Sequence, residues 1–489
     1  RVDGFTTAVV MGMGGSSLAP DLLHRTFGTA DGYLELRILD STDPAAVAAT
    51  VDDLDPLQTL WIVASKSGTT TEPLAFQADR WAAVERALDE RGSDQRAGEF
   101  FVAITDPGRS LEAIPHHDDL RERFLNLPTV GGRYSALTYV GLVPASLIGL
   151  DLDALLASAQ TMLARCSEPD PESNPGLQLG LAIGELARAG RDKLTFLADP
   201  AITSFGAWLE QLIAESTGKH GTGIVPVDLE PLLHPGTYGA DRAFVRLSLN
   251  GADDGGRAAL AEQLAKRGHP MIEIAIDDPI ELAGEAIRWE VATAFAGAVL
   301  GIDPFDQPNV EEAKERTRRL LGAHGSDPAA GAESDLADAI RVSAGEAALT
   351  DALRALTARL SAPSYVAIQA FIAPDPSRDA ALGLMREGLA DHRGCATTAG
   401  YGPRFLHSTG QLHKGGPATG VFLQLTSDHP TDRHIPGWPY TFGRLIDAQA
   451  RGDRDALRAH DRPLLRIHLG ADLDGDLAIV ERALFQALR

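Results

Sequence analysis

The chain has 489 residues, 44% of them apolar, and a formal net charge of −24. This length predicts about three domains, and the apolar fraction is typical of a globular protein. The negative charge excludes a general nucleic-acid binder, and no apolar run approaches the ~18 residues of a membrane helix.

The N-terminus lacks the basic and apolar regions of a secretory signal, so we expect a soluble, cytoplasmic protein. The sequence begins with Arg1 rather than Met, which indicates either a trimmed chain or one segment of a longer polypeptide. Cys166 and Cys395 are too few and too distant for a disulfide scaffold or a zinc site. We expect both to be small buried side chains, and we expect no metal site.

The first part of the chain, residues 1–168, alternates between apolar runs and helical patterns. The predicted strands are Thr7–Met11, Leu34–Leu39, Thr59–Ala64 and Phe100–Thr105, with a helical pattern at Trp81–Arg91. Runs that are apolar on both faces indicate a parallel sheet covered by helices on both sides. A ligand site is then expected beyond the carboxyl ends of the strands.

Two further segments repeat this alternation after a helical pair near Ser135–Arg165 and a connector at Asp170–Pro175. Residues 169–325 form a predicted second α/β domain, and residues 335–489 form a C-terminal α/β segment. The predicted strands are Leu194–Ala198, Gly223–Val227, Phe244–Leu249, Met271–Ile276, Tyr365–Ile372, Gly420–Thr426 and Leu464–Leu469. A long helix is expected at 280–300, and the Gly/Ala-rich stretch 322–335 is typical of a linker.

Two loops of the first segment have the composition of anion sites. GMGGSS, at 12–17, follows a strand and opens a helix, which favours either phosphate binding or a plain tight turn. SKSGTTTEP, at 65–73, collects hydroxyls around one lysine. Such a loop suits a monophosphate, although some hydroxyls could serve only as helix caps.

These loops occur together with three later motifs: GGRYS at 131–135, QLIAESTGK at 211–219 and FDQPNVEEAK at 305–314. In this order they resemble the glucose-6-phosphate isomerase family. The resemblance implies two doubly wound sugar-isomerase (SIS-type) domains and the interconversion of glucose 6-phosphate and fructose 6-phosphate, without a metal or a cofactor. The last segment resembles the part that accompanies this domain in fused transaldolase–isomerase polypeptides, which implies an N-terminal transaldolase domain in the full-length chain.

The resemblance also assigns the phosphate-binding residues. The expected set is Gly15, Ser16, Ser65, Lys66, Ser67 and Thr70. In the first loop, Ser16 with Gly15 is expected to hold the phosphate. In the second, Ser67 stands where relatives often have Thr, and it keeps a hydroxyl.

An aldose–ketose isomerase needs one base that reaches two neighbouring carbons, and positive charge near the enediolate oxygens. Glu215 matches the family's base, late in an expected helix Ser204–Thr217 that closes at Gly218. Gln211 lies one turn earlier and is expected on the same face. The alternative for Glu215 is a solvated surface acid.

Three more residues receive roles from the resemblance. Arg133 is expected near the reacting carbons, where the alternative is a surface salt bridge. Lys314 is expected at the ring and anomeric oxygens, where the alternative is a solvated charge cluster. Gln307 stands where relatives that also accept mannose 6-phosphate tend to have Thr, so it favours glucose and fructose.

The ring-opening histidine is the open question. Ordinary members have it between the glutamate and lysine motifs, where this chain offers His234 in no matching context. His407, in HSTGQ, resembles the family's histidine motif but follows the lysine motif. His413 is a further alternative. A histidine suits protonation of the ring oxygen near neutral pH.

Two other functions compete with this isomerase: a dual glucose/mannose phosphate isomerase, and a sugar-phosphate-binding SIS module without catalysis. The second would not need Glu215, Arg133 and Lys314 together. A homodimer is expected by analogy with the family.

Overall fold

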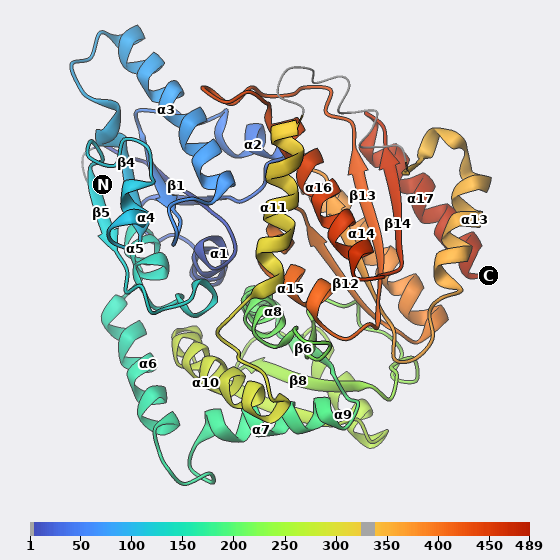
Figure 1. Ribbon diagram of the computed structural model, residues 1–489. Helices are drawn as coiled ribbons and strands as arrows, with labels where there is room; N and C mark the ends of the chain where they lie inside the picture. The colour runs from blue at the N-terminus through green and yellow to red at the C-terminus, as the bar shows by residue number, and fades with distance from the viewer. Residues whose placement is uncertain (1–3, 324–337) are drawn as a thin grey trace.

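A computed structural model describes residues 4–323 and 338–489, except for the side chains at 310–314, 318, 322 and 323. The expected linker 322–335 therefore lies almost wholly outside the described residues. The described residues form three parallel sheets covered by helices, as the sequence predicted (Figure 1). None of the described helices combines the length and hydropathy that a membrane crossing requires.

The first sheet has five parallel strands in the order β2-β1-β3-β4-β5. Val9 of β1 pairs with Arg37 on one side and Trp61 on the other. The elements are β1 (Thr7–Gly12), α1 (Gly15–Phe27), β2 (Glu35–Leu39), α2 (Pro44–Val51), β3 (Thr59–Ala64), α3 (Thr71–Arg91), η1 (Ala97–Phe100), β4 (Phe101–Thr105), α4 (Arg109–Glu112), β5 (Glu122–Leu125) and η2 (Gly132–Tyr134).

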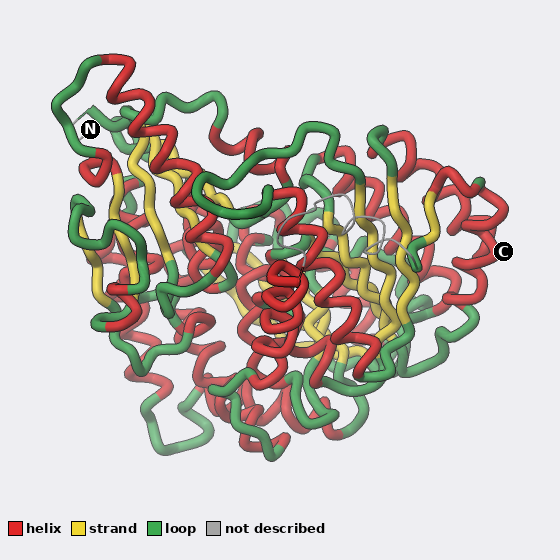
Figure 2. Tube along the Cα trace, turned by 45° about the horizontal axis from the view of Figure 1, so that its top comes forward, coloured by secondary structure: helices red, strands yellow, loops and turns green. Residues whose placement is uncertain are grey.

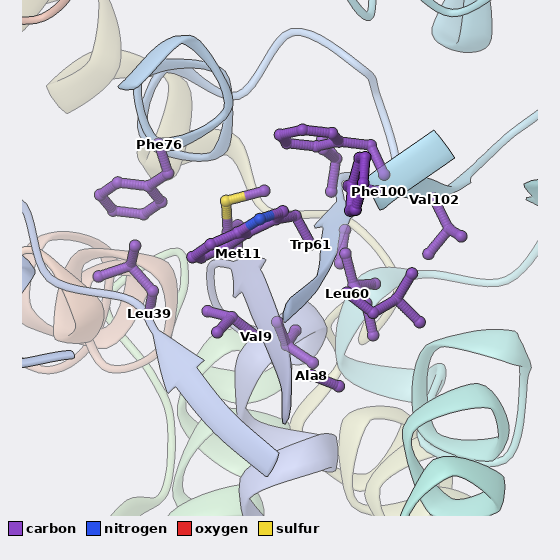
Figure 3. Packing of buried hydrophobic residues seen from close by; sticks show 14 of the residues in the cluster. Ala8, Val9, Met11, Leu39, Leu60, Trp61, Phe76, Phe100 and Val102 are labelled. Atoms are coloured by element: carbon purple, nitrogen blue, oxygen red, sulfur yellow. The ribbon is translucent and has the colours of Figure 1, made fainter. Parts of the chain in front are cut away.

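The core of this unit lies where β1 and β3 meet the covering helices. Every residue of these two strands is buried, because both faces of a doubly wound sheet are covered. Figure 3 shows Met11 and Trp61 from the strands packed near Phe76 of α3. The two strands that precede the candidate phosphate loops are thus fully embedded in the unit.

The second sheet has four parallel strands in the order β7-β6-β8-β9. Its core includes Trp208 and Trp289, which come from two of the covering helices. The elements are α5 (Tyr139–Leu147), α6 (Leu152–Cys166), α7 (Pro175–Arg188), β6 (Lys193–Ala198), η3 (Pro200–Ile202), α8 (Ser204–Thr217), β7 (Val225–Val227), β8 (Arg242–Leu249), α9 (Arg257–Lys266), β9 (Met271–Ile276), η4 (Pro279–Glu281), α10 (Leu282–Leu300) and α11 (Pro308–Ala323).

The third sheet has five parallel strands in the order β10-β14-β13-β11-β12. Its core is a separate apolar cluster that includes Leu353, Ile368 and Leu484. The elements are β10 (Ile340–Arg341), η5 (Val342–Ala344), α13 (Glu346–Thr357), β11 (Tyr365–Phe371), α14 (Pro376–Arg393), β12 (Ala396–Tyr401), η6 (Arg404–His407), α15 (Gly410–Gly415), β13 (Gly420–Ser427), α16 (Phe442–Ala459), β14 (Leu464–Leu469) and α17 (Leu473–Leu488).

All three sheets share one strand order once the edge strands β5 and β10 are set aside. When the remaining four strands of each unit are counted in chain order, the second strand lies at one edge of the sheet. The first, third and fourth strands follow it across the sheet. The C-terminal segment therefore repeats the doubly wound arrangement of the two units before it. The domain boundaries at 168/169, 325 and 335 remain predictions.

Several helices begin at side-chain caps that the sequence already shows. Asp43, Asn174 and Asp375 each accept a hydrogen bond from a backbone amide of the following helix, and each is followed by Pro at the first helical position. The structure adds strands β5, β10 and β12, which the sequence analysis missed. Cys166 and Cys395 are buried free cysteines, as expected, and burial raises the pKa of Cys395 to about 12.

The three units meet around α8 and α11. Helix α8 packs against α1, α10 and α15, while α11 packs against α15 and α16. In Figure 1, α11 runs between the first unit and the third, and Figure 2 shows the strands of those two units on opposite sides of a group of helices. Arg404 also joins the units, because its guanidinium contacts Asp21 at 2.7 Å and Asp40 at 3.2 Å.

Candidate functional site

A cavity of about 720 Å³ lies at the carboxyl ends of β1 and β3, enclosed by side chains from all three units. The strand order reverses between these two strands, and doubly wound folds bind ligands at such a switch point. Eleven of the twelve residues predicted from the sequence line this cavity: Gly15, Ser16, Ser65, Lys66, Ser67, Thr70, Arg133, Gln211, Glu215, Gln307 and His407.

Two helix N-termini contribute to the wall of the cavity. Helix α1 begins at Gly15 directly after β1, and α3 begins at Thr71 directly after the hydroxyl-rich loop. Residues of both first turns line the cavity. Backbone N–H groups and the helix dipole favour an anion at such positions.

The hydroxyl-rich loop is organised by contacts among its own side chains. Ser65 Oγ donates to Thr70 Oγ1 at 3.0 Å, and the hydroxyls of Ser67 and Thr69 lie 3.0 Å apart. The Lys66 ammonium pairs with Asp106 and donates to the Pro128 carbonyl at 2.8 Å. The loop thus presents hydroxyls, amides and one cation, while Asp106 balances the lysine charge.

Gly15 allows the first loop to touch the GGRYS turn. A Cβ on Gly15 would lie 1.9 Å from the Gly132 carbonyl oxygen, so no side chain fits there. Gly14 has φ +57, and a Cβ on it would meet the His407 carbonyl oxygen at 2.8 Å. These two glycines bring residues of the first and third units together at one wall.

Glu215 and Gln211 lie on one face of α8, which ends at Thr217 as the sequence predicted. The Gln211 amide donates to Glu215 Oε2 at 3.0 Å and to the His407 carbonyl at 2.8 Å. Glu215 is only 5% exposed. The alternative of a solvated surface acid is therefore wrong, and the carboxylate shares a cavity with the hydroxyl-rich loop.

Arg133 is buried, so the surface salt bridge considered for it is excluded. Its Nη1 lies 3.5 Å from Glu215 Oε1 and also contacts the Gln307 side chain. Its Nε donates to Ser216 Oγ at 2.7 Å. The guanidinium thus places a fixed positive charge beside the Glu215 carboxylate and holds the segment before Gln307.

Lys219, the last residue of the ESTGK motif, supports the same segment and was missed by the sequence analysis. Its ammonium is fully buried and donates to the carbonyls of Asp303 at 2.7 Å and Asp306 at 2.6 Å. Burial lowers the pKa of this lysine. Its presence in a quoted motif was the signal that could have identified it.

Gln307 precedes helix α11, which carries Lys314. The Lys314 side chain lies outside the described residues, so its predicted role stays a prediction. The helix start is described, because Gln411 of the HSTGQ motif accepts from the Asn309 amide at 2.8 Å and donates to the Gly218 carbonyl at 2.9 Å. That motif therefore connects the end of α8 to the start of α11.

His407 is the histidine that lines the cavity among the three considered. Its Nε2 lies 3.1 Å from Glu72 Oε1. His413 is buried in the third unit beside Phe422, and burial lowers its pKa. His234 Nδ1 accepts from the Gly236 amide at 3.1 Å, away from the cavity lining.

Glu72, Tyr440 and Gln449 are further lining residues that the sequence analysis did not assign to the site. Glu72 belongs to the quoted SKSGTTTEP loop, and its place there was the signal that could have identified it. Burial, with the Glu72 charge nearby, raises the pKa of Tyr440 to about 12. Tyr440 and Gln449 lie in no motif, so no sequence signal could have found them. Among the described residues no group of three or more acidic, histidine or cysteine side chains could hold a metal ion.

Comparisons with known proteins identify the family of the chain. The family described as "Phosphoglucose isomerase" matches residues 3–227. The glucose-6-phosphate isomerase of Rubrobacter xylanophilus is 32% identical, over 66% of this chain and 84% of that protein. The glucose-6-phosphate isomerase of Symbiobacterium thermophilum is 33% identical, over 65% of this chain and 80% of that protein.

Solved structures agree on the fold. A hypothetical protein from Thermus thermophilus superposes with a TM-score of 0.58 at 26% identity, covering 65% of this chain and 84% of that one. A glucose-6-phosphate isomerase from Chlamydia trachomatis superposes with a TM-score of 0.55 at 24% identity, covering 66% of this chain and 71% of that one. Each of these two relatives and two solved structures leaves about a third of this chain unmatched.

Proposed function

This chain is an enzyme of the glucose-6-phosphate isomerase family, and we propose that it interconverts glucose 6-phosphate and fructose 6-phosphate by proton transfer through Glu215. One observation carries the proposal. A buried carboxylate and a hydroxyl-rich loop between two helix N-termini line a single cavity of about 720 Å³. A cavity of that size holds a ligand the size of a hexose phosphate.

The phosphate is assigned to the two loops that follow β1 and β3. The first turns of α1 and α3 offer backbone N–H groups, and Ser16, Ser65 and Thr70 offer hydroxyls. These donors favour a compact dianion even though the whole chain is acidic. Fixing the phosphate positions the sugar carbons relative to α8.

Glu215 is assigned as the base. It removes the proton from C2 of the open-chain aldose, which leaves an enediol(ate), and it returns a proton to C1 while the hydroxyl proton passes from O2 to O1. The Arg133 charge, 3.5 Å from Glu215 Oε1, favours the negative charge that develops on the enediolate oxygens. Gln211 fixes the other carboxylate oxygen at 3.0 Å.

Ring opening is assigned to His407, which protonates the ring oxygen as the anomeric hydroxyl loses its proton. Its lining position and the 3.1 Å contact with Glu72 support this assignment. A carboxylate that contacts one ring nitrogen orients the imidazole and leaves the other nitrogen for the sugar. Lys314 is assigned to the ring and anomeric oxygens on the family resemblance alone. No metal or cofactor enters this proposal, and a homodimer and a cytoplasmic location belong to it as expectations from the family.

A coupled assay with fructose 6-phosphate tests the proposal. We expect Glu215→Gln to lower turnover at least about 100-fold, because it removes the base and keeps the shape. Glu210→Gln is the matched control, since Glu210 lies on the same helix but lines a second cavity. Equal turnover in wild type and Glu215→Gln would remove Glu215 from the reaction. Mannose 6-phosphate in the same assay tests the dual-specificity alternative.

A further inference from the structure

A row of hydrogen bonds crosses from the first unit to the third and back at the wall of the cavity. Thr42 Oγ1 donates to Gln449 Oε1 at 2.7 Å, and Gln449 Nε2 donates to Glu72 Oε1 at 2.6 Å. The same carboxylate oxygen contacts His407 Nε2 at 3.1 Å. Thr42, Gln449 and Glu72 are all at least 95% buried.

The direction of these bonds is set by the chemistry of the groups. A flipped Gln449 amide would place its oxygen 2.6 Å from a Glu72 oxygen, where two acceptors repel. The Thr42 hydroxyl supports the observed orientation by donating to the amide oxygen. The Gln449 N–H therefore points at the Glu72 carboxylate and fixes the position of its Oε1 atom.

The helix that carries Gln449 is itself anchored to the segment that carries His407. Asp453 lies one turn after Gln449 on α16, so the two side chains share a face. Asp453 Oδ1 lies 2.6 Å from the Lys414 ammonium on α15, and both side chains are at most 1% exposed. This buried pair fixes α16 relative to the stretch that follows His407.

We propose that Gln449 is a positioning residue for ring opening, acting on His407 through Glu72. Gln449 holds the carboxylate in the rotamer that places Glu72 Oε1 against the His407 imidazole and so orients that ring. His407 Nδ1 is then the nitrogen that exchanges a proton with the sugar oxygens. This inference rests on the proposed function, and it assigns the third unit a part in catalysis beyond supplying the histidine.

Ring opening can be measured apart from isomerisation. An open-chain aldose recloses on either face of its carbonyl, so an enzyme that opens the ring exchanges the α and β anomers of glucose 6-phosphate. In a Glu215→Gln background isomerisation is removed, and the enzyme-dependent exchange of anomers, followed by two-dimensional NMR exchange spectroscopy, reports ring opening alone.

In that background we expect Gln449→Met to slow anomer exchange about 10- to 100-fold, because a near-isosteric side chain loses its donor to a charged partner. Gln424→Met is the matched control. Gln424 is also fully buried and donates to the Ala450 carbonyl of α16 at 3.2 Å, but it does not line the cavity. It should leave exchange within about 2-fold of the background.

A second pair of variants keeps the inference testable if Gln449→Met folds poorly. Thr42→Val removes the donor to Gln449 and should slow exchange roughly 3- to 10-fold, while Thr42→Ser keeps the hydroxyl and should retain exchange. The affinity for glucose 6-phosphate should stay within about 2-fold in all four variants, because none of these groups is assigned to the phosphate.

The outcomes separate this inference from the proposed function. Continued isomerisation by the Glu215→Gln background would overturn the proposed function. If His407→Asn abolished anomer exchange in the Glu215→Gln background while Gln449→Met left it unchanged, the positioning role alone would be overturned. Equal slowing in Gln449→Met and Gln424→Met would also overturn it, because loosened packing of α16 would then explain the effect.

Discussion

Gly15→Ala tests whether the close approach of two loops builds the site. The new Cβ would lie 1.9 Å from the Gly132 carbonyl oxygen, whereas ordinary contacts begin near 3.4 Å. The Gly132 carbonyl is a backbone group that cannot rotate away, so the two loops must separate by about 1.5 Å. Arg133 follows Gly132 in the displaced turn and would move with it. A misplacement of about 1 Å at a catalytic site costs roughly 100-fold in rate.

We therefore expect Gly15→Ala to lower kcat with fructose 6-phosphate about 100-fold and to lower the free energy of unfolding by about 1–3 kcal/mol. Gly131→Ala is the control in the same turn, because its Cβ would meet only the Tyr134 ring at an ordinary 3.4 Å. The coupled assay and urea unfolding measure the two effects. Wild-type kcat in Gly15→Ala would refute the claim that this contact positions Arg133.

Two further predictions concern stability. Burial, with Asp228 nearby, raises the pKa of Glu210 to about 8, so the folded state holds a proton that the unfolded state releases near pH 4.5, and stability falls as pH rises towards 8. The free energy of unfolding of Glu210→Gln, measured in urea, should equal that of wild type at pH 5 and exceed it by about 1–3 kcal/mol at pH 9. Equal free energies of unfolding for the two proteins at both pH values would contradict this. Lys414→Met should cost about 3–5 kcal/mol, since it leaves Asp453 buried without its cation, and the double variant with Asp453→Leu should recover most of that loss. No recovery in the double variant would show that the pair does more than balance charge.

Much of the fold could be predicted because the central strands are apolar on both faces. Strands β3, β9 and β14 begin and end at the predicted residues. Strand β12 was missed because its sequence, ATTAGY, is small and polar and lies at the edge of its sheet. Strand β5 is likewise an edge strand with exposed ends. Edge strands are less completely covered by neighbouring strands and helices, so their apolar sequence pattern is weaker.

The site could be predicted wherever a residue lies in a local motif. Glu215, Gln211 and Arg133 were found in this way, and the cavity contains all three. Gln449 could not be found, because it contacts Glu72 across 377 positions and lies in an ordinary amphipathic helix. The same limit left three histidines open, and of these His407 lines the cavity and lies against Glu72.

The central claim is that Glu215 carries a proton between neighbouring carbons of the sugar. Conversion of fructose 6-phosphate in deuterated water tests it most directly, with deuterium at C2 of the glucose 6-phosphate product measured by NMR. We expect deuterium at C2 with wild type, since a carboxylate base exchanges its proton with solvent, and at least about 100-fold slower labelling with Glu215→Gln. Equal labelling by wild type and Glu215→Gln would contradict it.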